Sequence, residues 1–240
     1  MNPNVDEIVR NFVEDVRQIY GDSLLAIILY GSAASGEYVK GKSNINCLVL
    51  LKRVTMAELK RSTKYVRKWR KNGIVAPLFL DPAYTRSSAD VFPIEFLDMK
   101  ERYCLLYGQD FLRDLDVSLR NLRFQCEQEL KGKLLRLRQL YLERADSIEA
   151  LKSLMIKSLS SFTVLFKALL RLKGVAAPNS TDEILAQLSA LGLPTEAATR
   201  ILSLKRKDIK ARQDELDTLF DQYLAEIQAA VDYVDRAVVE

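Results

Sequence analysis

The sequence predicts an α/β (α+β) protein: a small mixed-sheet domain followed by an all-α antiparallel helical bundle. Three observations predict this fold class. Up to about residue 110, short continuous apolar runs typical of buried strands alternate with segments of helical period. After Gly108 the strand-like runs end, and the chain has helical period almost throughout. Glycine and proline residues punctuate that second part as they do between helices. We therefore expect domains at residues 1–110 and 111–240.

The first domain is expected to contain a helix, two strands, a second helix and two more strands. Apolar residues recur at helical spacing up to about Tyr20, and Thr55 is expected to cap a helix that ends near Lys71. The predicted strands are Leu24–Tyr30, Asn46–Leu51, Ile74–Leu80 and Val91–Met99. Residues 81–90 are rich in turn-forming types, and Pro93 places the fourth strand at an edge or at its start.

The second domain is expected to consist of helices joined by short connections. The predicted helices are residues 111–144, 147–173, 181–191, 195–206 and 208–238. Ser180 with Glu183 three residues later forms a capping-box pattern, which supports a helix start at that point.

Composition excludes several kinds of chemistry. The 240 residues include no histidine, which removes mechanisms that use imidazole as a base or a ligand and leaves carboxylates, lysine, tyrosine and divalent ions. The three cysteines, Cys47, Cys104 and Cys126, are widely spaced and predict buried apolar side chains rather than disulfides or a zinc cluster. The longest apolar runs are shorter than the roughly 20 residues of a membrane span, so we expect a cytoplasmic protein without a membrane segment.

One stretch combines a glycine-serine turn with two flanking strands. It is "LYGSAASGEYVKGKSNINCLVLL", residues 29–51, and its candidate phosphate-binding residues are Gly31, Ser32, Gly36 and Ser43. A glycine at a strand end permits a sharp turn, and the serine hydroxyl and the N–H groups of the turn can receive phosphate oxygens. Taken alone, this pattern occurs in many folds that bind nothing.

In its wider context the stretch resembles the signature of the nucleotidyltransferase superfamily that includes DNA polymerase β. In that family a Gly-Ser turn is followed by Ser-Asp-x-Asp at the start of an apolar strand. Residues 161–188, "SFTVLFKALLRLKGVAAPNSTDEILAQL", also look like the helical domains of kanamycin nucleotidyltransferase and HEPN-type proteins. The resemblance implies a nucleoside triphosphate and Mg²⁺ as cofactors. HEPN ribonucleases cut RNA with an arginine and a histidine, so a chain without histidine is not expected to use that mechanism.

The chain departs from the family at the two metal positions, which are Asn44 and Asn46. Residues i and i+2 of a strand point to the same side, so the geometry of a metal-binding pair is expected to remain. Amide oxygens are neutral, however, whereas Mg²⁺ sites depend on carboxylate charge. Each lost carboxylate is expected to cost about 3–4 kcal/mol of transition-state stabilisation, and both together on the order of 10⁴-fold in turnover. Only weak Mg²⁺ binding is then expected. An alternative is that Ser43-Asn44 is an ordinary turn before a strand.

The third carboxylate of the family lies on a later strand, which the resemblance places in Phe92–Asp110. Alternation puts Glu95 between Ile94 and Phe96 in mid-strand, a costly position for a charge, so Glu95 is the candidate catalytic residue and metal ligand. Asp98 has an ordinary alternative as a helix cap.

The predicted helix at residues 56–71 is strongly basic and carries Tyr65 and Trp69 four residues apart. Cations beside rings are typical of nucleic-acid surfaces, but a solvated helix face is the favoured interpretation.

Three functions remain open from the sequence. The leading hypothesis is a catalytically degenerate nucleotidyltransferase-superfamily protein that binds a nucleotide or a protein partner. The first alternative is an active enzyme that transfers a nucleotidyl group to a small-molecule or protein hydroxyl, with Glu95 and either Asp98 or Glu37 holding a reduced metal site. The second is an antitoxin-like or regulatory interaction protein, with a homodimer as a further expectation from the broad apolar stripes of the helical domain.

Overall fold

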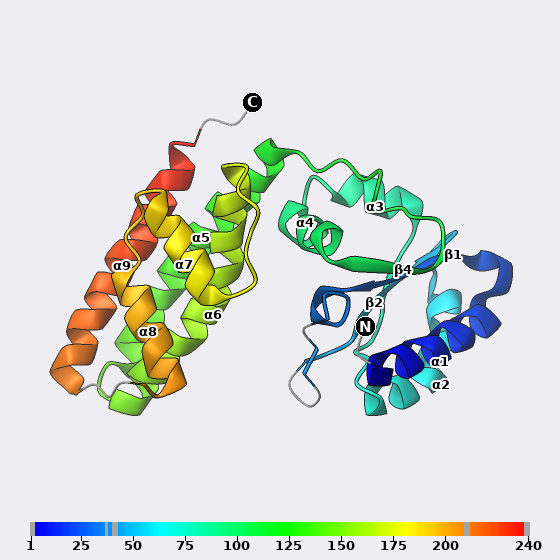
Figure 1. Cartoon of the computed structure of the whole chain (residues 1–240), viewed down its shortest axis with the longest axis horizontal. Helices are drawn as coiled ribbons and strands as arrows, with labels where there is room; N and C mark the ends of the chain where they lie inside the picture. Colours follow the sequence, from blue (N-terminus) through cyan, green and yellow to red (C-terminus); the bar gives the residue numbers. More distant parts are fainter. Residues whose placement is uncertain (1–2, 37, 40–42, 209–211, 238–240) are drawn as a thin grey trace. The chain divides into compact units, whose positions relative to one another are not determined.

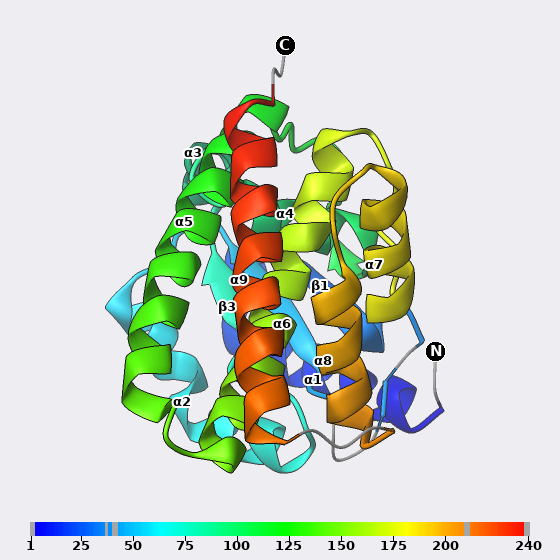
Figure 2. The same ribbon diagram turned by 90° about the vertical axis from the view of Figure 1, so that its left-hand side faces the viewer.

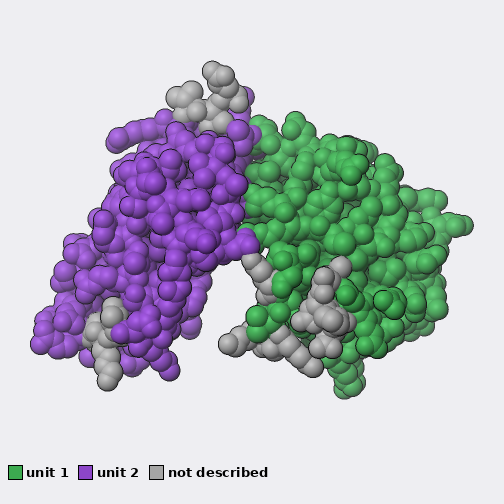
Figure 3. All heavy atoms as spheres, in the orientation of Figure 1, with its two compact units in different colours: residues 1–118 green, residues 119–240 purple. Residues whose placement is uncertain are grey.

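The computed structural model describes residues 3–36, 38–39, 43–208 and 212–237, so Glu37 lies outside the described residues. The chain divides into two compact units, residues 1–118 and 119–240 (Figure 3). The division follows Ser118, whereas the sequence analysis places the domain boundary after residue 110. We refer to these as the α/β unit and the helical unit.

The α/β unit is built on one mixed sheet. Its strands are β1 (Leu24–Tyr30), β2 (Asn46–Leu51), β3 (Leu78–Leu80) and β4 (Tyr103–Gly108). Their order in the sheet is β3-β2-β1-β4. Strand β1 is antiparallel to both β2 and β4, and β3 is parallel to β2. The structure thus confirms the predicted mixed sheet.

Helices cover both faces of this sheet (Figure 1). The helices α1 (Pro3–Tyr20) and α2 (Met56–Lys71) lie on one face, and α3 (Pro82–Ser88) and α4 (Pro93–Glu101) lie on the other. Alternate residues of β2 enter the two cores: Cys47 and Val49 pack with the α1 side, while Leu48 and Leu50 pack with Phe96 of α4. Burial on both faces explains why the first two strands have continuous apolar sequences.

The prediction for residues 91–108 is wrong in the order of its elements. Val91–Met99 was expected to be a strand, but Pro93–Glu101 is helix α4, and the strand β4 follows it. Proline suits the first turn of a helix because its fixed φ is helical. The N–H groups of that turn form no hydrogen bond within the helix, so the absence of an N–H in proline costs nothing there. The turn-rich stretch before it contains α3, where the carboxylate of Asp81 accepts a hydrogen bond from the N–H of Tyr84 at 2.9 Å.

The helical unit is an antiparallel bundle, as predicted. Its helices are α5 (Leu119–Arg144), α6 (Ile148–Leu172), α7 (Thr181–Ala190), α8 (Glu196–Arg206) and α9 (Gln213–Asp235). Figure 2 shows the long helices α5, α6 and α9 side by side. The predicted start of α7 is confirmed, because Ser180 Oγ accepts a hydrogen bond from the N–H of Glu183 at 3.2 Å. Among the described helices, α6 is long and apolar enough to span a membrane, and half of its most apolar window is buried within the chain.

A buried carboxylate holds α8 to α9. Glu226 of α9 is 8% exposed, and its two oxygens accept hydrogen bonds from the N–H groups of Ala197 and Ala198 at 2.6 and 2.9 Å. These N–H groups belong to the first turn of α8 and have no partner within the helix. Burial raises the pKa of Glu226 above its ordinary value, and the two N–H donors oppose that rise.

Replacing Glu226 by alanine is expected to destabilise the helical unit by about 2–5 kcal/mol, since it leaves two buried N–H donors unsatisfied. Urea unfolding followed by circular dichroism measures this loss. Glu215→Ala is the matched control, because Glu215 caps the start of the same helix through the N–H of Arg212 at a more exposed position. A loss no larger than that of the control would contradict the role assigned to Glu226.

Candidate functional site

The glycine-serine turn lies directly at the end of β1. Gly31 has a φ of +75°, a backbone conformation that favours glycine, and it begins a short 3₁₀ turn over Gly31–Ala33. Its N–H donates to the carbonyl of Arg102 at 3.0 Å, and its own carbonyl accepts from the N–H groups of Ala34 and Ser35 at 2.9 and 3.2 Å. The turn is therefore tied on one side to the segment between α4 and β4. Sequence reasoning missed this role of Arg102, because a main-chain contact carries no residue-type signal.

The structure brings Asn46 onto this turn. Asn46 is the first residue of β2 and pairs with Tyr30, the residue before Gly31. A Cβ atom added to Gly31 would lie 3.3 Å from Nδ2 of Asn46, so the amide stands directly beside the glycine. Ile45 is fully buried on the α1 side of the sheet, which leaves Asn44 exposed and Asn46 half-buried on its other side. Asn44 and Asn46 thus have the i, i+2 spacing expected of a metal-binding pair, and both carry amide side chains.

Ser43 and Gly36 lie in the connection between the turn and β2. The N–H of Ser43 donates to the carbonyl of Val39 at 2.8 Å, and its Oγ accepts from the N–H of Val39 at 3.1 Å. Both hydrogen bonds of Ser43 are therefore made to Val39, within the same connection. Gly36 occupies a turn after Ser35, whose Oγ donates to the carbonyl of Ser32 at 3.3 Å. Of the predicted phosphate-binding residues, Gly31 and Ser32 share the turn beside Asn46.

Three ionisable side chains on the strands beside the turn, those of Tyr30, Tyr103 and Cys47, are protonated at neutral pH. Tyr30 pairs with Asn46 on one side and with Tyr103 on the other. Burial raises the pKa of both tyrosines above their ordinary value, and the hydrogen bond to Asp110 adds to the rise at Tyr103. Burial also raises the pKa of the Cys47 thiol to about 12. None of these three groups is a general base or a thiolate nucleophile near pH 7.

Glu95 does not stand where the sequence analysis placed it. It is an exposed residue in the first turn of α4, so the argument from strand alternation no longer applies. Seven residues separate it from Arg102, and at 1.5 Å per helical residue this is about 10 Å along the chain from the residue that holds Gly31. Glu95 lines a groove of about 630 Å³ together with Leu78 of β3 and Tyr84 of α3. Asp98 lies one helical turn closer to Arg102 than Glu95 does.

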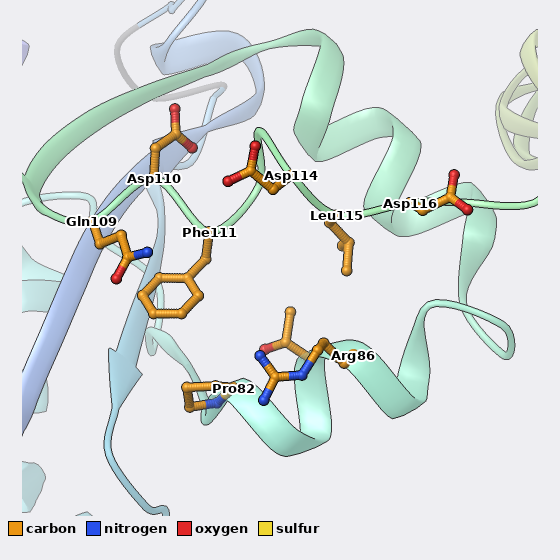
Figure 4. Close-up of a pocket in the computed structure, with 9 residues that line it drawn as sticks. Pro82, Arg86, Gln109, Asp110, Phe111, Asp114, Leu115 and Asp116 are labelled. Atoms are coloured by element: carbon orange, nitrogen blue, oxygen red, sulfur yellow. The ribbon is translucent and has the colours of Figure 1, made fainter.

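A second hollow of the α/β unit, of about 430 Å³, gathers several carboxylates (Figure 4). Its charged lining residues are Arg86, Asp110, Asp114 and Asp116. The ring of Phe111 points into the hollow, whereas the carboxylates of Asp110 and Asp116 point away from its centre. Asp110 also accepts a hydrogen bond from the Tyr103 hydroxyl at 2.9 Å.

Within the described ranges, no group of three histidine, cysteine or acidic side chains is arranged to hold a metal ion. The amide oxygens of Asn44 and Asn46 are neutral and add no charge to hold a divalent ion.

The basic helix α2 uses its rings for packing. Trp69 is 2% exposed, meets the ring of Phe12 edge-on at 5.0 Å, and donates through Nε1 to Asp15 at 2.9 Å. Lys68 forms an ion pair with the same carboxylate at 2.7 Å, and Tyr65 stacks on Trp69. The exposed cations of this helix include Lys60, Lys64, Arg67, Arg70 and Lys71. This arrangement favours the interpretation of a solvated face over that of a stacking surface for nucleic acid.

Comparison with known proteins was made by sequence and by structure. No protein-family model matches the chain. A curated protein of Methanocaldococcus jannaschii, whose name assigns it provisionally to the protein adenylyltransferases, is 28% identical over 97 residues, which are 40% of this chain and 92% of that protein. The crystal structure of spectinomycin adenyltransferase AAD(9) from Enterococcus faecialis, with ATP and spectinomycin, is similar over 92% of this chain and 98% of that chain, with a TM-score of 0.59 and 13% identity.

The mixed sheet, the turn after β1 and the helical unit define the nucleotidyltransferase class of folds. The sequence similarity and the fold together support the assignment of this chain to the nucleotidyltransferase superfamily, as the resemblance of residues 29–51 implied.

Proposed function

We propose that this protein binds a nucleoside triphosphate through the Gly31–Ala33 turn and has lost ordinary two-metal nucleotidyl transfer. The observation that carries the proposal is the Asn46 amide, whose Nδ2 lies 3.3 Å from the Cβ position of Gly31. An amide at this place can donate a hydrogen bond to a phosphate oxygen, whereas a carboxylate there would need a cation between itself and the phosphate.

The surroundings of the turn support binding without transfer. Proton removal from an acceptor hydroxyl needs a base. The ordinary pKa values of Tyr30, Tyr103 and Cys47 already lie above 7 and burial raises them further, so none of these three groups is a base near pH 7. ATP is the first nucleotide to test, because the relative from Methanocaldococcus jannaschii is named for adenylyl transfer and the spectinomycin adenyltransferase structure contains ATP.

Calorimetric titration of the full chain with ATP, with and without Mg²⁺, tests the proposal. We expect the two dissociation constants to agree within about threefold, since neutral amides add no charge to hold the ion. We also expect no adenylyl label on the protein or on small hydroxyl compounds after incubation with ATP labelled at the α-phosphate. Tight binding that requires Mg²⁺, accompanied by transfer of the label, would refute the proposal.

The active-enzyme alternative assigns the remaining metal ligation to acids of α4. Glu95→Gln and Asp98→Asn separate the candidates, because the two positions lie almost one turn apart on the same helix. If transfer is detected, its loss in only one of these variants would identify the acid responsible. Equal transfer in both variants would exclude α4 as the source of the metal ligand.

The other candidate function is binding of a protein partner or of a second copy of the chain. An exposed apolar face of α5 supports it. Phe124, Leu135 and Leu142 of α5 are 56%, 60% and 84% exposed. Their spacings of 11 and 7 residues place them on one face of the helix. If this face binds a second copy, wild-type protein should sediment as a dimer and Leu135→Glu as a monomer. A wild-type monomer at about 100 μM would argue against self-association through α5.

A further inference from the structure

A groove of about 340 Å³ in the helical unit lies between α5 and α6 and carries charge of one sign. Its charged lining residues are Lys133, Arg136, Arg144 and Lys157. Carboxylates are absent from the described residues that line it. The apolar part of the lining, its floor, consists of Leu137, Leu140, Leu154 and Phe162, and Ser158 and Ser161 complete the lining. The volume falls at the small end of the range for organic ligands.

The positive charge of this groove is largely uncompensated. Lys133 forms one partly exposed ion pair with Glu129 at 3.2 Å, and Arg136 donates to the neutral amide of Gln139 at 3.4 Å. Neither Arg144 nor Lys157 forms an ion pair with another described residue. Lys131, on the same helix but outside the groove, is instead paired with Glu127 at 2.5 Å and with Asp235 at 3.0 Å. Cations held together without acids repel one another, and an anion would relieve that repulsion.

The serine hydroxyls of the groove determine which hydrogen-bonding groups a ligand must carry, in addition to its negative charge. Ser158 Oγ donates its proton to the carbonyl of Met155 at 2.9 Å, and Ser161 Oγ donates to the carbonyl of Ser158 at 2.8 Å. The Ser158 hydroxyl also forms a hydrogen bond with the hydroxyl of buried Tyr223 at 3.4 Å, so the free acceptor lone pairs lie mainly on Ser161. A ligand that satisfies the whole groove has an anionic group for the cations, an apolar ring for the floor, and a hydroxyl or amino donor for Ser161.

We propose that the groove between α5 and α6 binds a mononucleotide, with its phosphate on the cations and its base on the apolar floor. Arginine and lysine both bind phosphate strongly, and arginine can do so through two parallel hydrogen bonds. The groove belongs to the helical unit and is a different site from the turn at Gly31. It therefore does not depend on the function proposed for that turn.

Titration of the full chain with AMP, followed by calorimetry, tests this site. Lys157→Glu is expected to weaken AMP binding at least about tenfold, because it removes a phosphate ligand and introduces repulsion. Lys152→Glu is the control, since it makes the same charge change on the same helix at a position outside the groove. Gly31→Ala strains the turn of the α/β unit, so AMP binding that persists in this variant takes place outside that turn.

Four outcomes would overturn the proposal. They are absence of AMP binding to the wild-type chain at millimolar concentration, an equal loss in Lys157→Glu and Lys152→Glu, loss of AMP binding in Gly31→Ala alone, and tighter binding of a single-stranded oligonucleotide than of AMP in the same groove. The third outcome would assign AMP to the turn, so it separates failure of this inference from failure of the function proposed above.

Discussion

The double variant Asn44→Asp, Asn46→Asp is expected to bind ATP in a Mg²⁺-dependent manner that the wild-type protein lacks. Asn46 already stands beside Gly31, and Asn44 precedes it by two residues, so the substitutions place two carboxylates at the spacing of a metal-binding pair. Without Mg²⁺ the variant should bind ATP more weakly than wild type, because carboxylates repel phosphates. With Mg²⁺ it should bind at least about tenfold more tightly than it does without the ion.

Calorimetry of both proteins with and without the ion measures this reversal. Asn121→Asp with Gln128→Glu is a suitable control, since it adds the same two charges on α5 in the helical unit. If the wild-type protein already shows the Mg²⁺ effect, or if the double variant behaves like the control, the amides at positions 44 and 46 do not determine how ATP binding responds to Mg²⁺.

Gly108→Ala is expected to destabilise the α/β unit by at least about 3 kcal/mol. Gly108 ends β4 with a φ of +81°, and a Cβ atom there would lie 1.9 Å from the carbonyl oxygen of Leu25 in β1. Both the backbone conformation and the close approach of the two strands exclude a side chain. Because the contact is with backbone, no rotamer change relieves it.

Thermal unfolding of Gly108→Ala beside Gly132→Ala provides a matched comparison. Gly132 lies in α5, where an added Cβ meets no heavy atom within 4 Å. Alanine there is expected to stabilise the helix by about 0.5–1 kcal/mol, because it has the higher helix propensity. A Gly108→Ala protein as stable as wild type would show that β4 and β1 are not packed as closely as the structure indicates.

The sequence and the structure agree where each segment is either strongly periodic or buried on both faces. The first two strands were predicted from continuous apolar runs, and they lie at the centre of the sheet with helices on both sides. The bundle helices were predicted from periods sustained over many residues. Segments with such patterns form the predicted helix or strand because burial of a whole apolar face stabilises it by more than the conformational preferences of single residues oppose it.

Residues 91–108 show where this reasoning fails. Val91–Met99 and Tyr103–Gly108 are both short, and over so few residues hydrophobic periodicity does not separate a strand from a helical turn. β4 is an edge strand, and its pairing with β1 brings together residues about 75 positions apart in the chain. The error carried over to Glu95, whose selection rested on strand alternation.

By itself, the sequence determined the fold class and the glycine-serine turn, because both follow from residue type and local spacing. It also has asparagines at positions 44 and 46, where the family that the stretch resembles has carboxylates. Only the tertiary structure decided which groups surround that turn. Long-range strand pairing brings Asn46 and Arg102 to Gly31, and helix α4 turns Glu95 toward a separate groove. These contacts depend on which distant segments bury their apolar faces together, and the local spacing of residues does not predict such long-range pairing.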